Sequence, residues 1–397
     1  MSIGSAAVRH DPDSWAERGV EAATAPAVSI VMPCLNEEET VGTCVAKAVS
    51  WLSRSGMPGE VLVVDNGSSD RSAEIAAAAG ARVIHERRRG YGQAYLRGFA
   101  EARGELIVMG DADDTYDFGD LDALLAPLSN GADMVVGNRF SGGIAAGAMP
   151  WLHRYVGSPI INFVIRTFFG TRIGDSQSGF RAFRRSATEQ LGLRSTGMEL
   201  ASEMIVSAAR AGFRIVEVPA PYAVRRGESK LNTLRDGWRH LRYLLLAAPD
   251  FLFILPGAAL VLLGVAATTI SLAAPDGVQV GPMTWRPVFA GTILLAIGVN
   301  AVLFGVIAKL FGVSRGLLRE DRWSALYRRW FKLEAALGLA ALLFFAGLVL
   351  ELLLFGAWTT SAVRIDGLQH AALAQTLMIV GAELGFSAFL VVTVQAS

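Results

Sequence analysis

The sequence predicts an α/β domain followed by a membrane domain of four helices. From Ala27 to about Pro249, short β-branched runs alternate with amphipathic segments, a pattern typical of a largely parallel sheet covered by helices. Beyond Pro249 lie four apolar stretches of about 24 residues, each long enough to cross a hydrocarbon core of roughly 30 Å. With 52 % apolar and 18 % charged residues, the 397-residue chain is too apolar for an ordinary soluble enzyme.

The α/β domain is expected at residues 27–230, after a flexible tail at residues 1–26. The tail ends in a proline and contains no apolar run of signal-peptide length. The expected strands are Val28–Met32, Val61–Val64, Arg82–His85, Leu106–Met109, Met134–Val136 and Ile215–Val218. The expected helices include Thr40–Leu52, Ser69–Ala79 and Gln93–Ala102.

Residues 231–249 are predicted to form an amphipathic helix beside the membrane. Basic side chains alternate with Leu and Trp between Leu231 and Ala248, as in helices that lie on an anionic leaflet. The alternative is a solvated helix that packs on the domain.

The membrane domain is expected at residues 250–397. Its predicted spans are Phe251–Ala274, Val288–Phe311, Ala335–Trp358 and Ala371–Val394. The connection between the second and third spans, counted from Lys309 to Lys332, carries seven Lys or Arg residues and the other two loops one arginine each, so the basic connection should be cytoplasmic. An integral plasma-membrane protein with a cytoplasmic α/β domain follows.

Three features of the membrane domain leave alternatives open. Glu351 and Glu383 lie inside predicted spans, where they either pair between helices or mark a polar path. Small residues from Gly257 to Gly264 offer a face for a homo-oligomer.

Charge and cysteine content exclude other classes of protein. The 36 basic and 36 acidic residues cancel, so we expect no nucleic-acid partner held by a positive excess. Cys34 and Cys44 are too few for a disulfide scaffold or a four-ligand zinc site, and we expect both to be buried thiols.

The clearest chemical signal is an apolar strand that runs into acids at Gly110-Asp111-Ala112-Asp113-Asp114. Two carboxylates one residue apart at a strand end can share Mg²⁺ or Mn²⁺ with a diphosphate. By itself the pattern is also that of a common acidic loop. The first two strands end in Asn36, Glu37 and Asp65, which should open into the same crevice. No Gly-x-Gly-x-x-Gly follows the first strand and no P-loop is present, which disfavours a dinucleotide site or an NTPase.

Seven motifs in order carry a resemblance to a known family. They are Pro-x-x-Asn-Glu, Val-Asp-Asn-Gly-Ser-x-Asp, Gly-x-Gly-x-Ala, Asp-Ala-Asp, Gly-Asn-Arg, Ser-Gly-Phe-Arg and Gly-Glu-Ser-Lys-Leu, between Val28 and Leu231. The sequence resembles the family 2 glycosyltransferases with a GT-A fold. More narrowly, it is similar to membrane-anchored polyprenyl-phosphate sugar synthases of the dolichol-phosphate mannose and glucose synthase type.

The resemblance implies roles for particular residues. Asp111 and Asp113 would hold the metal, and Asp113, Asp114 and Arg139 would act in catalysis. The nucleotide-sugar donor would contact Pro33, Leu35, Asn36, Glu37, Asp65, Gly92, Asp111, Ala112, Asp113, Asp175 and Glu203. The phosphate of the lipid acceptor would contact Arg154, Ser158, Arg225, Arg226, Ser229 and Lys230. From the residues alone, Asp175 could equally be a turn residue and Glu203 a solvated helix position.

The implied reaction is an inverting, metal-dependent transfer of a sugar from a nucleotide-sugar to polyprenyl phosphate. The runs Asp113–Asp117 and Gly147–Arg154 look more like glucose than mannose synthases, which favours UDP-glucose. Val224 stands where relatives often have an arginine, which leaves open whether Arg225 or Arg226 meets the acceptor. The alternatives are a GDP-mannose enzyme, a processive polysaccharide synthase, whose Gln-x-x-Arg-Trp motif is missing, and a nucleotide-binding subunit of a transporter.

Overall fold

The structure is a computed structural model that describes residues 26–227, 233–315, 318, 320–360 and 367–396. The chain divides into two compact units, residues 1–243 and 244–397. The division falls inside one helix, α9 (Thr233–Ala247). Each unit is described by itself below.

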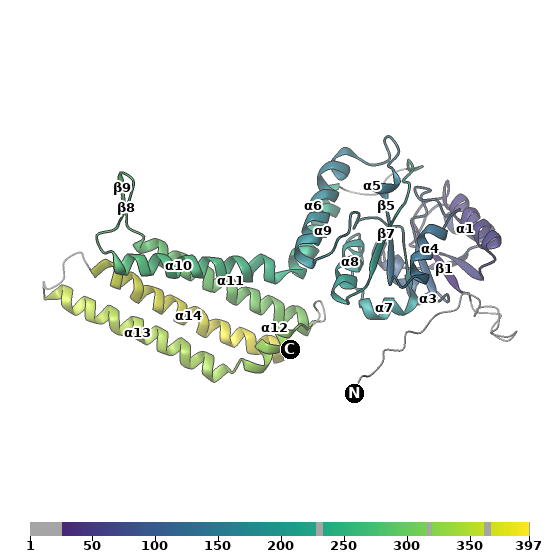
Figure 1. Cartoon of the computed structure of the whole chain (residues 1–397). Helices are drawn as coiled ribbons and strands as arrows, with labels where there is room; N and C mark the ends of the chain where they lie inside the picture. The colour runs from purple at the N-terminus through teal and green to yellow at the C-terminus, as the bar shows by residue number, and fades with distance from the viewer. Residues whose placement is uncertain (1–25, 228–232, 316–317, 319, 361–366, 397) are drawn as a thin grey trace, which may run out of the picture. The chain divides into compact units, whose positions relative to one another are not determined.

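The first unit is built on a seven-stranded mixed sheet (Figure 1). The strands lie in the order β3-β2-β1-β4-β6-β5-β7, and β6 is antiparallel to both of its neighbours. The other strand pairs are parallel. The strands are β1 (Val28–Cys34), β2 (Gly59–Asp65), β3 (Arg82–His85), β4 (Leu106–Met109), β5 (Met134–Asn138), β6 (Arg181–Arg184) and β7 (Ile215–Pro219).

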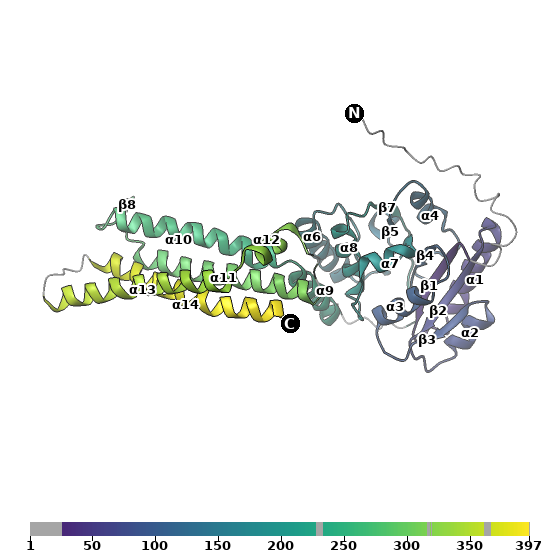
Figure 2. The ribbon, with the colours of Figure 1, turned by 90° about the horizontal axis from the view of Figure 1, so that it is seen from below.

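Helices cover both faces of this sheet, as Figure 2 shows from below. Consecutive residues of β1, such as Ile30 and Val31, point to opposite faces of the sheet, and both are fully buried. Trp51 of α1 belongs to the core on one face, and Gly98 of α3 lies against Val31 on the other. The helices are α1 (Val41–Ser55), α2 (Ser72–Ala78), α3 (Tyr91–Glu101), α4 (Asp122–Ser129), α5 (Arg139–Gly142), α6 (Ser158–Phe169), α7 (Arg185–Leu191) and α8 (Leu200–Arg210).

The six predicted strands are confirmed, and two have the predicted bounds. The seventh strand, β6, was not predicted. It has only four residues and two of them are arginines, so it lacks the apolar run that identifies a strand. Arg181 is nevertheless fully buried, because its guanidinium donates to the carbonyl oxygens of Ser178 and Ser176 at 2.9 and 2.8 Å.

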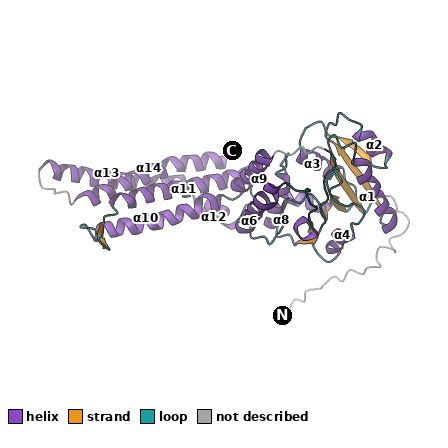
Figure 3. Cartoon of the chain, turned by 90° about the horizontal axis from the view of Figure 1, so that it is seen from above, coloured by secondary structure: helices purple, strands orange, loops and turns teal. Residues whose placement is uncertain are grey.

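The second unit contains four helices that are long and apolar enough to cross a membrane, among the residues that the structure describes (Figure 3). The first consists of a π-helical turn (Asp250–Ile254) and α10 (Leu255–Ala273). The others are α11 (Val288–Ser314), α13 (Leu333–Thr359) and α14 (Leu368–Ala396). A hairpin of β8 (Val278–Val280) and β9 (Met283–Trp285) joins the first two, and α12 (Arg322–Trp330) lies between α11 and α13.

Glycines bring the backbones of α10 and α11 close together. A Cβ atom added at Gly257 would lie 2.8 Å from the carbonyl oxygen of Gly298, and one at Gly264 would lie 2.7 Å from the amide nitrogen of Leu295. The small-residue face from Gly257 to Gly264 is therefore packed against α11 of the same chain, and self-association stays a prediction. Small residues favour close helix packing within one chain as well as between chains.

Polar side chains also link the membrane helices. The side-chain amide of Asn300 in α11 donates to Glu383 in α14 at 3.3 Å, which is the interhelical pairing expected of a polar residue in a span. Thr292 and Thr376 form a second link at 2.9 Å.

Candidate active site

The candidate site lies at the carboxyl ends of β1, β2 and β4. These strands are adjacent and parallel, with Cys34 opposite Asp65 and Val31 opposite Met109. The loops that follow them therefore open at the same edge of the sheet, where ligands of open α/β sheets bind. Asn36, Glu37, Asp65 and the acids that follow Met109 all lie at this edge, as the sequence predicted.

The backbone is strained at two points of this edge. Asn36 and Asp114 have φ values of +50° and +59°, and they are the only non-glycine residues with positive φ in the described part of the chain. Residues other than glycine pay about 1 kcal/mol or more in this conformation, and such strain is concentrated at functional sites. The loop after β1 holds its shape through Asn36, whose side-chain oxygen accepts a 2.7 Å hydrogen bond from the amide of Ser69.

Asp111 and Asp113 present their carboxylates with different partners. Asp111 accepts a 3.2 Å hydrogen bond from the hydroxyl of Tyr95 in α3. One oxygen of Asp113 accepts from the hydroxyl and the amide of Thr115 at 2.6 and 3.2 Å. Burial and the nearby charge of Asp113 raise the pKa of Asp111 to about 7, because the two carboxylates are close in a poorly solvated place.

Arg225 supplies positive charge to this acid cluster. Its guanidinium donates to Asp113 at 2.8 Å and to Glu37, so one side chain bridges the loops after β1 and β4. The Nε atom of Arg225 is buried and has no hydrogen-bond partner among the described residues. The structure brings Arg225 beside the predicted metal and donor residues, and its predicted contact with the acceptor phosphate stays a prediction.

Asp114 and Arg226 flank the cluster. Asp114 forms a 2.7 Å ion pair with Lys47 of α1, which the sequence analysis did not single out. The more exposed Arg226 lies 3.9 Å from the other oxygen of Asp114. Asp114 thus has a cation beside it on either side. Its catalytic role stays a prediction.

Asp65 is held at the end of β2 by hydrogen bonds. Its carboxylate accepts from the amide of Ser68 at 3.0 Å, and Nδ1 of His85 lies 3.0 Å from its other oxygen. Burial raises the pKa of Asp65, but the bonds from Ser68 and His85 outweigh burial and lower it below its ordinary value. Asp65 is therefore an anion at neutral pH, as a ribose-binding carboxylate must be.

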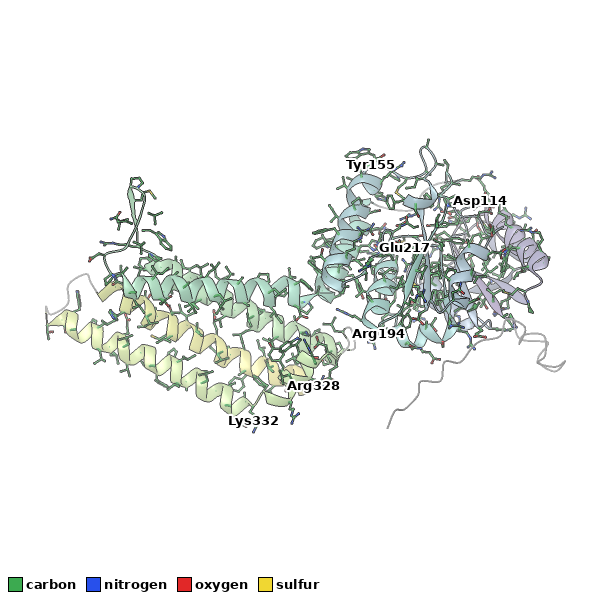
Figure 4. All side chains as sticks on the ribbon, in the orientation of Figure 1. Asp114, Tyr155, Arg194, Glu217, Arg328 and Lys332 are labelled. Carbon is green, nitrogen blue, oxygen red and sulfur yellow. The ribbon has the colours of Figure 1, made fainter. Side chains whose placement is uncertain are left out.

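Arg139 and Asp175 form a buried ion pair. The guanidinium of Arg139 donates to both oxygens of Asp175 at 2.7 and 2.8 Å, and Asp175 is fully buried. Glu217 of β7, labelled in Figure 4, accepts from the amides of Gly174 and Asp175 at 2.7 and 2.8 Å. Asp175 is therefore more than a turn residue, because its buried carboxylate holds the guanidinium of Arg139 in place. The catalytic role of Arg139 and the donor contact of Asp175 stay predictions.

Two other predicted donor contacts have packing partners in the structure. The carboxylate of Glu203 is buried and accepts from the amides of Arg194 and Ser195 at 3.1 and 2.8 Å. It is therefore not a solvated helix position.

Gly92 lies in α3, and a Cβ atom there would collide with the backbone of residues 195–197. Pro33, Leu35 and Ala112 lie beside the acid loops, and the carbonyl of Ala112 accepts a 2.7 Å bond from Thr40.

Among the described residues, no contact joins Arg154 or Ser158 to Arg225 or Arg226, and their role at the acceptor stays a prediction. Arg154 lies in a π-helical turn (His153–Gly157) with its guanidinium over the ring of Tyr155, and Ser158 is buried at the start of α6. Figure 4 labels Tyr155 and Asp114, which mark these two regions of the unit. Ser229 and Lys230 lie outside the described residues.

The residues present fit a divalent cation that is shared with a substrate. No group of three His, Cys, Asp or Glu side chains suited to a metal ion occurs in the described ranges. Asp111 and Asp113 supply two carboxylates, and Mg²⁺ sites on diphosphate substrates commonly use one or two. The raised pKa of Asp111 shows that the pair lacks sufficient positive charge, and Arg225 is the only cation with a direct ion pair to Asp113 among the described residues.

Comparison with known proteins identifies the family. Residues 29–192 match the glycosyl transferase family 2 domain, and residues 306–395 match the glycosyltransferase family 2 C-terminal transmembrane region. The low-salt glycan biosynthesis hexosyltransferase Agl6 of Haloferax volcanii is 38 % identical over 371 residues, which cover 92 % of this chain and 88 % of that protein. The chain belongs to glycosyltransferase family 2, and it is an integral membrane glycosyltransferase.

Other matches cover the first unit. A dolichyl-phosphate hexose transferase of Haloferax volcanii is 34 % identical over 211 residues, covering 53 % of this chain and 89 % of that protein. The crystal structure of glucosyl-3-phosphoglycerate synthase from Mycobacterium tuberculosis with Mn²⁺ and UDP-glucose aligns with 25 % identity and a TM-score of 0.44. That alignment covers 56 % of this chain and 78 % of the other.

Proposed function

We propose that this glycosyltransferase moves a hexosyl group, preferably glucose from UDP-glucose, to polyprenyl phosphate. The observation that carries the proposal is the pair of acids Asp111 and Asp113 after β4, with Arg225 bridging Asp113 to Glu37 after β1. A protein that only binds a nucleotide would not require two adjacent carboxylates and an arginine at the expected position of a diphosphate. The relative named as a dolichyl-phosphate hexose transferase supports the acceptor class.

The donor would lie across the carboxyl edge of the sheet. Asp65, kept ionised by Ser68 and His85, is suited to the ribose hydroxyls. Asn36 and the loop after β1 would contact the base. Asp111 and Asp113 would direct the diphosphate toward the guanidinium of Arg225.

The chemical step needs charge stabilisation more than a base. A polyprenyl phosphate oxygen is already anionic at neutral pH, so it attacks the anomeric carbon without a strong general base. A divalent cation bound by Asp111 and Asp113 would neutralise the charge that develops on the departing nucleoside diphosphate. Arg225 would add a second positive charge there. A single displacement inverts the anomeric centre and forms no covalent enzyme intermediate.

We further propose that the catalytic unit is cytoplasmic and the membrane is the plasma membrane. Four crossings leave the chain before α10 and the chain after α14 on the same side, together with the basic segment around α12. The positive-inside rule supports a cytoplasmic location for that segment. The acceptor would then be taken from the inner leaflet, with Arg154, Ser158 and Arg226 as proposed contacts of its phosphate.

The test is transfer of radiolabel into an organic phase. The purified full-length chain would be given short-chain polyprenyl phosphate, Mg²⁺ or Mn²⁺, and in turn UDP-glucose, GDP-mannose and UDP-N-acetylhexosamines. We expect lipid-linked label from UDP-glucose that EDTA abolishes. Asp111→Asn should abolish transfer, while the matched variant Asp120→Asn, an exposed acid outside the cluster, should retain it.

Other outcomes would contradict parts of the proposal. Label from GDP-mannose alone would replace glucose by mannose as the transferred sugar. A water-soluble polymer without lipid product would show that polyprenyl phosphate is not the acceptor. EDTA-resistant transfer would remove the metal from the mechanism.

A further inference from the structure

The helix α12 (Arg322–Trp330) is tied to the membrane boundary on both sides. It follows α11, which ends at Ser314, and it precedes α13, which begins at Leu333. Two residues, Phe331 and Lys332, connect α12 to α13, and so short a link spans roughly 10 Å at most. Because α13 is a candidate membrane span whose first turn carries one charge, Glu334, α12 lies at the surface of the bilayer.

An ion-pair network centred on the buried Lys309 fixes the start of α12. The carboxylate of Asp321 accepts from the amide of Ser324 at 2.8 Å and so caps the helix. The same carboxylate forms a 2.7 Å ion pair with Lys309 of α11, which is buried and also pairs with Asp250 at 2.8 Å. The helix is thus anchored to the end of two spans, and its faces have a defined direction within the second unit.

The apolar side of α12 is partly exposed within the described part of the second unit. Trp323 and Leu326 are 52 % and 44 % exposed, and with Tyr327 they share one side at helical spacing. Arg322, Trp323 and Leu326 line a shallow hollow of about 360 Å³. Aromatic and aliphatic side chains at this depth commonly insert between lipid headgroups and acyl chains.

At helical spacing, Arg322 and Arg329 flank the apolar side of α12 and place positive charge at its edge. Arg322 and Arg329 are exposed and have no acidic partner among the residues that the structure describes. Arg328 differs, because it forms a 3.0 Å ion pair with Glu320. Figure 4 shows Arg328 and Lys332 at the end of the helical bundle where α12 lies.

We propose that α12 binds anionic phospholipid headgroups of the leaflet that it borders. Arg322 and Arg329 contact lipid phosphates, while Trp323 and Leu326 insert beside the acyl chains. The two arginines lie seven residues apart along the helix, so they meet separate headgroups rather than converge on one phosphate. This spacing favours bulk anionic phospholipid over a single bound polyprenyl phosphate. The inference does not depend on the proposed function.

The test measures lipid selectivity of the full-length chain. The protein would be inserted into nanodiscs of phosphatidylcholine and phosphatidylglycerol, and native mass spectrometry would count the lipids retained by the released protein. We expect phosphatidylglycerol to be enriched, and Arg322→Gln with Arg329→Gln to reduce the enrichment by roughly 25-fold, at about fivefold for each arginine. Arg328→Gln, which removes an already paired charge, is the matched control and should change it less than twofold.

A second measurement needs no change of charge and so remains useful if the double variant misfolds. Brominated phosphatidylglycerol should quench tryptophan fluorescence more strongly than brominated phosphatidylcholine, and the difference should fall in Trp323→Phe. Equal enrichment in the wild type and the double variant would overturn the proposal. An Arg328→Gln effect as large as that of Arg322→Gln would also overturn it, as would displacement of the lipid by polyprenyl phosphate at equal concentration.

Discussion

Asp111 has a raised pKa because it is poorly solvated and close to Asp113. A divalent cation binds only the ionised carboxylate, so the apparent affinity for Mn²⁺ should fall about tenfold per pH unit below pH 7. The raised pKa also means that the folded, metal-free chain holds a proton that the unfolded chain has lost. Folding stability should therefore decrease as the pH rises from about 4 to about 7, and a bound divalent cation should restore it.

Mn²⁺ titration followed by electron paramagnetic resonance and thermal melting of the purified chain would check both trends. Asp111→Asn should remove the pH dependence of the melting curve in this range. Mn²⁺ affinity that stays constant from pH 5 to pH 8 would contradict the assignment of Asp111 as a metal ligand.

Arg225 competes with a cation for Asp113. Its charge-assisted hydrogen bond to Asp113 is worth about 1.5 kcal/mol, the low end of the range for charged groups, because the side chain is partly exposed. Arg225→Gln should therefore increase Mn²⁺ affinity by up to about tenfold while it lowers the rate of sugar transfer. Isothermal titration of the nucleotide-free chain would measure the affinity, with Arg226→Gln as the matched control. Weaker Mn²⁺ binding by Arg225→Gln would show that Arg225 supports the metal site rather than competing for it.

At the scale of elements, the Arg139–Asp175 pair joins α5 to the segment that enters β6. Removal of one partner leaves a buried charge, so Asp175→Asn should cost about 3–5 kcal/mol of folding stability. Thermal melting in detergent would reveal the loss, and the exposed Asp117→Asn should melt like the wild type. An Asp175→Asn chain that melts normally but no longer binds the donor would place Asp175 in the donor site instead.

Some strands and contacts could be predicted from the sequence and others could not. The apolar runs of β1, β2 and β4 were predictable because each is bounded by turn residues and buried on both faces. β6 was not, since its burial depends on Arg181 reaching backbone carbonyls that the fold brings near. The same holds for Gly92, whose close contact with residues 195–197 joins distant parts of the chain.

At the scale of the whole molecule, the proposed topology can be tested with single cysteines. Cys34 and Cys44 are buried, and burial raises the pKa of both thiols to about 12, so neither should react with maleimide. Pro282→Cys, in the turn between β8 and β9, should react with a membrane-impermeant maleimide in intact cells. Ala325→Cys, on α12, should react only after the membrane is opened. The reverse pattern would invert the topology.

The sequence by itself determined the family, where six of the strands lie along the chain, the four spans and the acids at the strand ends. These features are written in local patterns: apolar periodicity, turn residues and motifs a few residues long. Tertiary structure decided how charges pair, because pairing joins residues far apart in the chain. It placed Arg225 between Glu37 and Asp113, Arg139 on Asp175, and Lys309 on the cap of α12. An arginine or a glycine looks the same in sequence whether it meets a substrate or another part of the fold, and only the fold determines its neighbour.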